Sequence, residues 1–322
     1  MKICFIILAH HQPNIFHKLI RQLSWENSDI IVHIDKRSDI KEFELTGHNN
    51  IHFVKKRRRV HWCGWSLTRT MIELLEHALK VSKADYFIYL AGTDLLVKNR
   101  LKLLEYLTEN YPANFLNFYP LVPGIWGYGL INRYRLVDLK AKFINPRNIE
   151  QEGVSKTKIK LAMLVSKIEK ALNSRFQPRN TTWTDLYHGS SRWCLNRETV
   201  QYLVRFYRSK SSGRLKNYLR LSANSDEIFI QTAILNSAMK KYCIGFNEVE
   251  MKEIFAHKRQ PLLDEIRVYL HYIDWSTERE DPAILVESDF DAIQNSGKFF
   301  ACKFTDEKSF GLVKLIEKNL NI

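Results

Sequence analysis

Residues 3–34, ICFIILAHHQPNIFHKLIRQLSWENSDIIVHI, contain the pattern that decides the fold. Residues 3–9 form a continuous apolar run of strand length, and a second, largely apolar run covers residues 29–34. Such runs are typical of strands that are buried on both faces of a parallel sheet. Pro13 suits the first turn of an intervening helix, whose apolar face comprises Ile15, Phe16, Leu19, Ile20 and Leu23. The stretch therefore predicts a β-α-β unit.

The alternation continues through the first 120 residues and predicts an α/β fold. Further strands are expected at residues 51–54, 86–90 and 114–118, and helices are expected after Ser66, a candidate cap, and over residues 100–109. No GxGxxG follows the first strand and the chain has no GxxxxGK[ST]. A dinucleotide fingerprint and a P-loop are therefore disfavoured.

Composition limits the classes of partner. The chain has 322 residues and a net charge of +14, which favours an anionic partner such as nucleic acid, an acidic lipid surface or a phosphorylated substrate. The five cysteines are scattered without a CxxC pair, which argues against a disulfide framework and a structural zinc site. Because no signal peptide or membrane-spanning run is recognisable, we expect a cytoplasmic location, with peripheral contact at the inner face of the membrane left open.

Two basic segments have alternative interpretations. The run Lys55–Arg59, KKRRR, suits a solvated loop, a contact with phosphates or anionic lipid, or nucleic-acid binding, although no nucleic-acid motif accompanies it. Residues 155–176 predict a basic helix with Leu161, Leu164, Val165, Ile168 and Leu172 on one side. That helix suits either packing on its own domain or an anionic membrane surface.

The stretch 222–237, SANSDEIFIQTAILNS, predicts a helix that Ser225 caps, with Asp226 and Glu227 in its first turn. Acidic residues at this place complement the helix dipole without any further function. Taken alone, the stretch therefore has a structural explanation.

Seven blocks of the chain together resemble the core-2/I-branching β-1,6-N-acetylglucosaminyltransferase family, glycosyltransferase family 14, which includes the peptide O-xylosyltransferases. They occur in the order of that family: 7–23 with 30–38 (ILAHHQPNIFHKLIRQL, IIVHIDKRS), 60–79 (VHWCGWSLTRTMIELLEHAL), 86–99 (YFIYLAGTDLLVKN), 186–204 (LYHGSSRWCLNRETVQYLV), 224–237 (NSDEIFIQTAILNS), 271–275 (HYIDW) and 299–306 (FFACKFTD).

The resemblance implies a single GT-A-type, Rossmann-like domain over residues 1–322, with a mixed central sheet flanked by helices. Residues 1–120 would form the nucleotide-binding half, and residues 121–322 the acceptor and catalytic half. It also implies an inverting transfer from a UDP-sugar to a glycan hydroxyl. Most GT-A enzymes hold a metal with Asp-x-Asp, but this family resembles them in fold while using basic side chains instead.

Site residues follow from the same resemblance. Glu227 matches the catalytic base, with Ser225 where the family often has proline. The residues that the resemblance implies for nucleotide-sugar binding are His10, Asp35, Asp94 and Lys303. The residues that it implies for acceptor binding are Trp275 and Arg133.

The diphosphate site departs from the family pattern. Cys302 replaces a basic residue that often precedes Lys303 in relatives, and Lys298 is a candidate for a second basic ligand. A single aspartate, Asp94, follows strand 86–90 where Asp-x-Asp would stand, which weakens a metal site without excluding it. No metal or other cofactor is therefore expected.

The expected function is transfer of N-acetylglucosamine from UDP to a glycan, or a lipid-linked glycan, in bacterial surface polysaccharide synthesis. A xylosyl or other UDP-sugar transferase is the alternative. A basic nucleic-acid- or membrane-binding protein is a more distant one.

Overall fold

The computed structural model describes residues 1–45, 47, 49–124, 127–144, 154–176, 179, 185–257, 270–275, 279 and 282–320. Its centre is a six-stranded sheet with the order β3-β2-β1-β4-β9-β6. The first four strands in this order are parallel, whereas β9 is antiparallel to both of its neighbours. In chain order, these strands are β1 (Ile3–Ala9), β2 (Ser28–Ile34), β3 (Ile51–Phe53), β4 (Tyr86–Ala91), β6 (Phe115–Leu116) and β9 (Trp193–Asn196).

Two smaller sheets complete the strand pairing of the described residues. In one, β11 pairs in parallel with β10 and antiparallel with β5, and the other is the antiparallel pair β7-β8. The carboxyl ends of β10 and β11 therefore lie at a common edge. These strands are β5 (Leu95–Leu96), β7 (Tyr119–Pro120), β8 (Tyr187–His188), β10 (His271–Ile273) and β11 (Phe300–Cys302).

Strand β1 explains why the large sheet is buried on both faces. Its side chains alternate between two apolar clusters, so Cys4 and Ile6 pack on one side and Phe5 and Ile7 on the other. The continuous apolar run of residues 3–9 is thus used on both faces. The predicted mixed central sheet flanked by helices is confirmed.

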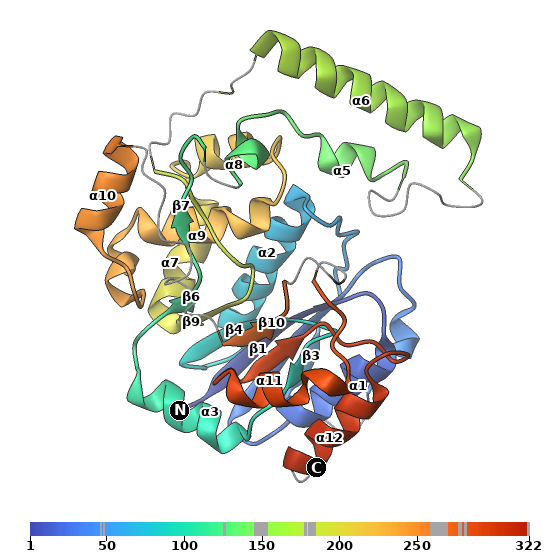
Figure 1. The fold of residues 1–322 in the computed structure, drawn as a ribbon, viewed down its shortest axis with the longest axis vertical. Coiled ribbons are helices and arrows are strands. Elements are labelled where there is room, and N and C mark those ends of the chain that lie inside the picture. Colours follow the sequence, from blue (N-terminus) through green and yellow to red (C-terminus); the bar gives the residue numbers. More distant parts are fainter. Residues whose placement is uncertain are drawn as a thin grey trace.

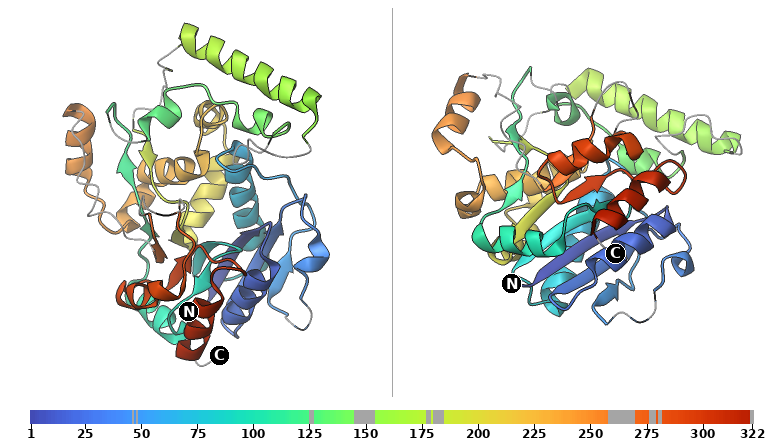
Figure 2. Two further views of the ribbon diagram at one scale, coloured as in Figure 1. Left: turned by 45° about the vertical axis from the view of Figure 1, so that its right-hand side comes forward. Right: turned by 60° about the horizontal axis from the view of Figure 1, so that its bottom comes forward.

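Helices cover both faces of the sheet (Figures 1 and 2). The first cluster includes residues of α2 (Trp65–Val81), α7 (Arg197–Arg208) and α9 (Phe229–Leu235). The second includes residues of α1 (Pro13–Leu23), α3 (Arg100–Glu109), α11 (Phe290–Asn295) and α12 (Phe310–Leu320). The remaining helices are α4 (Tyr128–Ile131), α5 (Val137–Lys140), α6 (Lys156–Phe176), α8 (Gly213–Leu219) and α10 (Glu248–His257).

One predicted helix cap is wrong. Helix α2 begins at Trp65, one residue before Ser66, and the Ser66 hydroxyl donates to Asp138 Oδ1 at 2.6 Å. Asp138 also accepts the Ser66 backbone N–H at 2.9 Å, so a side chain from α5 satisfies the helix start. A tertiary contact has therefore replaced the expected local cap.

The predicted boundary at residue 120 between a nucleotide half and an acceptor half stays a prediction. None of the helices in the described residues is both long enough and apolar enough to cross a membrane.

Candidate functional site

Glu227 ends a single 3₁₀ turn, Ser225–Glu227 (η2), that precedes helix α9. Asn224 reverses the chain before this turn in the left-handed conformation, with φ 51° and ψ 40°. The predicted cap by Ser225 is wrong, because its hydroxyl lies 2.7 Å from Thr68 Oγ1 and donates to the Gly64 carbonyl at 3.3 Å. Tertiary bonds to the start of α2 thus fix the turn that carries Glu227.

The Glu227 carboxylate has two polar neighbours and remains partly open to solvent. Its Oε2 lies 3.2 Å from His188 Nε2 and accepts from Asn224 Nδ2 at 2.9 Å. Its side chain is 23% exposed. A carboxylate that is held in place and still accessible can receive a proton from a bound hydroxyl group.

The backbone next to His188 can pack closely against Glu227 and Asn117 only because residue 189 is glycine. The Gly189 N–H donates to the Glu227 carbonyl at 2.8 Å. A Cβ atom on Gly189 would lie 1.8 Å from the Asn117 carbonyl oxygen, well inside any real contact. The backbones at Asn117, Gly189 and Glu227 therefore pack so closely that no side chain fits at position 189.

Asp226, next to Glu227, is buried, and its pKa lies well above the ordinary value. Burial raises its pKa, the nearby Glu227 carboxylate adds to the rise, and the pKa reaches about 8. Arg192 acts in the opposite direction but does not cancel these effects.

A second group of polar side chains lies after β4. Arg192 binds Asp94 with two nitrogens, Nε to Oδ2 at 3.0 Å and Nη2 to Oδ1 at 3.1 Å. The Ala91 N–H donates to Asp94 Oδ2 at 2.8 Å, and His271 Nε2 lies 3.5 Å from the same oxygen. The Asp94 side chain is 0% exposed and that of Arg192 is 15% exposed.

The ion pair determines the charges of this group. Burial alone would raise the pKa of Asp94, but Arg192 and His271 outweigh it and hold that pKa below its ordinary value. Asp94 in turn raises the pKa of Arg192, although burial opposes this. Burial lowers the pKa of His271, with Arg192 and Lys298 contributing and Asp94 opposing, so the imidazole is neutral. At neutral pH the group is therefore an Asp94–Arg192 ion pair beside a neutral histidine.

The segment 188–192, HGSSR, connects the two groups. At one end His188 contacts Glu227, and at the other end Arg192 binds Asp94. Between them, the Ser190 carbonyl accepts from Gln231 Nε2 at 2.8 Å, which ties the segment to α9. The structure thus brings the predicted base and Asp94 to one region through five consecutive residues.

Asp35 and His10 follow the carboxyl ends of β2 and β1. Asp35 is buried and accepts four hydrogen bonds, from the backbone, Nε and Nη2 of Arg37 and from the Val60 N–H. Burial would raise its pKa, but these bonds hold it below the ordinary value. His10 is exposed and its ring stacks on His11, while its carbonyl accepts from Ser38 Oγ at 2.7 Å.

The basic run after β3 is partly used inside the protein. Arg57 donates to the carbonyls of Ile34 and Asp35, at 3.1 and 2.7 Å, and Arg58 forms an ion pair with Glu73. Lys55, Lys56 and Arg59 remain exposed. Two of the five basic side chains therefore hold the loop after β2 and the face of α2.

Lys303 and Trp275 follow the adjacent parallel strands β11 and β10. The Phe304 N–H donates to the Thr93 carbonyl at 3.0 Å, which places Lys303 beside the loop that carries Asp94. Lys303 is half-buried, and its ammonium group has no hydrogen-bond or ion-pair partner among the residues that the structure describes. Trp275 is 49% exposed.

Arg133 is exposed on the loop after α4. Its carbonyl accepts from Arg179 Nη1 at 3.2 Å, and the same nitrogen donates to Ser222 Oγ at 3.0 Å. Arg133 is therefore connected to the Glu227 segment through Arg179 and not by direct contact.

Sequence comparisons find similar proteins for part of this chain. Residues 3–123 match the family model described as Core-2/I-Branching enzyme. Residues 3–123 are therefore called the Core-2/I-branching region. The Core-2/I-branching region contains His10, Asp35 and Asp94, whereas Glu227 and Lys303 lie beyond it.

The curated relatives that the chain matches are named xylosyltransferases. "Xylosyltransferase 2" of Homo sapiens is 27% identical over 123 residues, and "Xylosyltransferase" of Ciona intestinalis is 27% identical over 124 residues. Each match covers 36% of this chain and only 14% of the relative. Among solved structures, S. aureus TarS 1-349 matches with 12% identity and a TM-score of 0.34, covering 80% of this chain and 70% of that one.

Sequence reasoning missed three side chains of the site, His188, Arg192 and His271. His188 and Arg192 stand in the block HGSSRWCL, and His271 opens the block HYIDW, both of which carry the family resemblance. Membership of these blocks was a signal for them, but nothing in the local sequence indicated that Arg192 meets Asp94.

The residues after β4 do not fit a bound metal ion. A divalent cation needs free carboxylate oxygens, and both oxygens of Asp94 are bonded to Arg192. Within the described ranges, no group of three or more histidine, cysteine, aspartate or glutamate side chains is arranged to hold a metal.

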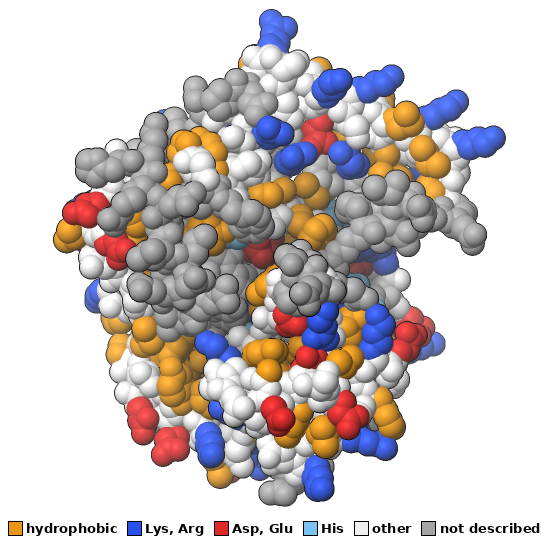
Figure 3. Space-filling view, in the orientation of Figure 1, with side chains coloured by type: hydrophobic (Ala, Val, Ile, Leu, Met, Phe, Trp, Pro, Cys, Tyr) orange, Lys and Arg blue, Asp and Glu red, His pale blue; other side chains and the backbone are white. Residues whose placement is uncertain are grey.

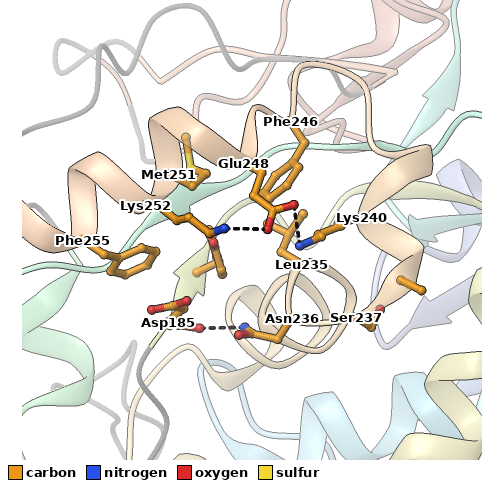
Figure 4. A pocket seen from close by; sticks show the side chains of 12 residues that line it. Asp185, Leu235, Asn236, Ser237, Lys240, Phe246, Glu248, Met251, Lys252 and Phe255 are labelled. Carbon is orange, nitrogen blue, oxygen red and sulfur yellow. Dashed lines mark hydrogen bonds and ion pairs between the residues drawn. The ribbon is translucent and has the colours of Figure 1, made fainter.

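A separate cavity of about 350 Å³ lies between α9 and α10 (Figure 4). Phe246, Met251 and Phe255 form its apolar wall, and Lys240 and Lys252 both bind Glu248, at 2.8 and 3.1 Å. None of the predicted site residues lines it. The cavity is therefore distinct from the site at the strand ends.

Proposed function

We propose that this chain is an inverting glycosyltransferase that transfers a sugar from a UDP-sugar to a hydroxyl group of a glycan. The observation that carries the proposal is the segment 188–192, which joins an accessible carboxylate at Glu227 to the Asp94–Arg192 ion pair. The match of residues 3–123 to the Core-2/I-branching family model supports it.

Glu227 is proposed as the general base. Direct displacement at the anomeric carbon requires removal of the proton from the attacking hydroxyl group. The Glu227 carboxylate is partly exposed, and Asn224 and His188 hold its Oε2. In this mechanism the proton passes from the acceptor oxygen to Glu227 as the new glycosidic bond forms and the bond to UDP breaks.

Lys303 is proposed to stabilise the departing UDP. The diphosphate gains negative charge as its bond to the donor sugar breaks. A fixed cation nearby lowers the energy of that state. Lys303 adjoins the Asp94 loop and has an ammonium group without a partner among the described residues.

The reaction is proposed to proceed without a divalent metal, since Arg192 occupies the Asp94 carboxylate. Activity with a UDP-sugar is expected to be the same in EDTA as in Mg²⁺ or Mn²⁺. Strict dependence on added metal would contradict this part of the proposal.

N-acetylglucosamine is the first donor sugar to test, and xylose is the alternative because the curated relatives are named xylosyltransferases. The proposed setting is bacterial surface polysaccharide synthesis on the cytoplasmic side of the membrane. Thermal shift against a panel of UDP-sugars would identify the donor, since a ligand that binds only the folded state raises Tm.

Replacing the base is the direct test. Glu227→Gln keeps the shape of the side chain but removes the proton acceptor, so kcat is expected to fall by about 10²–10⁴-fold. UDP-sugar binding, measured by thermal shift, is expected to remain. Glu307→Gln, the same change at an exposed position, is the matched control. Full activity of the Glu227 variant would refute the assignment.

A further inference from the structure

Helix α6 contacts the rest of the protein through one narrow face. Its buried residues are Ala162, Val165 and Glu169. Glu169 binds Lys140 of α5 at 2.7 Å, and Asn173 exchanges hydrogen bonds with the backbone of Tyr134, at 2.7 and 3.1 Å. In each view of the ribbon, α6 lies on the outside of the molecule (Figures 1 and 2).

A second apolar face of α6, beside the buried one, is exposed. Leu161, Leu164 and Ile168 are 39%, 53% and 44% exposed, and their spacing of three and four residues places them on one side of the helix. Of the apolar side that the sequence predicts for this helix, only Val165 is fully buried. A contiguous exposed apolar face of this kind indicates an interaction surface.

The charges on α6 indicate which kind of partner its exposed surface can bind. The helix carries six basic residues, and its single acidic residue is the buried, paired Glu169. Lys156, Lys160 and Lys167 form a stripe beside the apolar face, because their spacing of four and seven residues keeps them on one side. Basic side chains alternate with hydrophobic ones along the helix (Figure 3). The outer surface of α6 is therefore apolar and cationic, without acidic groups.

We propose that α6 lies in the plane of an anionic phospholipid surface. Leu161, Leu164 and Ile168 would enter the boundary between headgroups and acyl chains, while the lysines bind lipid phosphates. A second copy of the helix is a poorer partner, because a symmetric contact would bring like charges together. This inference concerns where the protein binds and does not depend on the proposed sugar transfer.

The surface is connected to the predicted acceptor residue. Asn173 of α6 holds Tyr134, which directly follows Arg133. A membrane bound through α6 would thus lie beside the loop assigned to the acceptor. This arrangement suits an acceptor glycan that is carried on a lipid.

The test is cosedimentation of the full chain with vesicles. Wild type is expected to bind vesicles of equal phosphatidylglycerol and phosphatidylcholine, and not vesicles of phosphatidylcholine alone. The variant Lys156→Glu, Lys160→Glu, Lys167→Glu is expected to bind at least about 100-fold more weakly, from roughly fivefold per lysine. Its matched control makes the same change in charge on α3 and α12, at the far end of the molecule, with Lys102→Glu, Lys314→Glu and Lys318→Glu.

A second variant tests the apolar face. Leu164→Gln with Ile168→Gln is expected to weaken vesicle binding by about tenfold or more while Tm stays close to that of wild type, because both side chains are exposed. Unchanged vesicle binding by both α6 variants, or equal binding to both kinds of vesicle, would overturn the proposal. So would a concentration-dependent dimer that the glutamine variant abolishes in the absence of vesicle binding.

Discussion

Two aspartates at strand ends of the same sheet are each bound by an arginine, yet the two pairs are built differently. Asp35 binds Arg37, two residues away, and the side chain of Arg37 is 50% exposed. Asp94 binds Arg192, 98 residues away, and that side chain is 15% exposed. The first pair joins the loop after β2 to the backbone of Val60, whereas the second joins the end of β4 to the segment that leads to Glu227.

We therefore expect solvent exposure of the arginine to determine how much each pair contributes to the free energy of unfolding. Both aspartates are buried, but water can reach the space left by an exposed arginine far more easily than the space left by an enclosed one. The same substitution, arginine to methionine, can therefore be compared at the two places.

The largest effect is expected from Arg192→Met. It leaves the Asp94 carboxylate buried without its cation, and the free energy of unfolding at pH 7 is expected to fall by about 3–5 kcal/mol. The loss should shrink in acid, because protonation then neutralises Asp94 in the variant. Urea unfolding at pH 7 and pH 4 measures both effects, and a loss below about 1 kcal/mol at pH 7 would show that the pair is not buried in solution.

An intermediate effect is expected at Asp226, beside the same arginine. Its raised pKa, about 8, means that the folded state holds a proton that the unfolded state loses. Its contribution is complete below its ordinary pKa of 3.8 and is lost as pH rises through about 8.

Asp226→Asn removes this titration. Its stability relative to wild type is therefore expected to grow between pH 5 and pH 8, by at most about 1.4 kcal/mol per pH unit, and then level off. Thermal unfolding across this range measures the difference. A difference that does not vary with pH would contradict a raised pKa.

The smallest effect is expected from Arg37→Met. Asp35 keeps the hydrogen bonds from the backbone N–H groups of Arg37 and Val60, and the vacated place is open to water. The expected loss in the free energy of unfolding is about 1 kcal/mol or less. A loss as large as that of Arg192→Met would remove the distinction between the two pairs.

The regular elements could be predicted because their causes are local. The apolar run of β1, Pro13 at the start of α1 and the bounds of α3 follow from periodicity and turn chemistry, and the structure confirms them. Local chemistry also explains the start of α7, where the Asn196 side chain caps the helix by accepting from the Thr199 N–H at 2.8 Å.

Features that depend on tertiary contacts could not be predicted in this way. Ser66 and Ser225 have the composition of helix caps, but their hydroxyl groups bond to Asp138 and Thr68, which lie far away in sequence. Arg192 and His271 reach Asp94 only after the chain folds. The assigned roles of Glu227 and Lys303 rest on the family resemblance and stay predictions.

Gly189 has a consequence for anyone who wishes to alter substrate preference by directed evolution. Any side chain there would collide with the Asn117 carbonyl, so a randomised library across residues 188–192 is expected to return glycine alone at this position. Ser191, which is partly exposed, is expected to accept many replacements. Within the segment 188–192, position 191 is therefore expected to tolerate substitution, whereas position 189 is not.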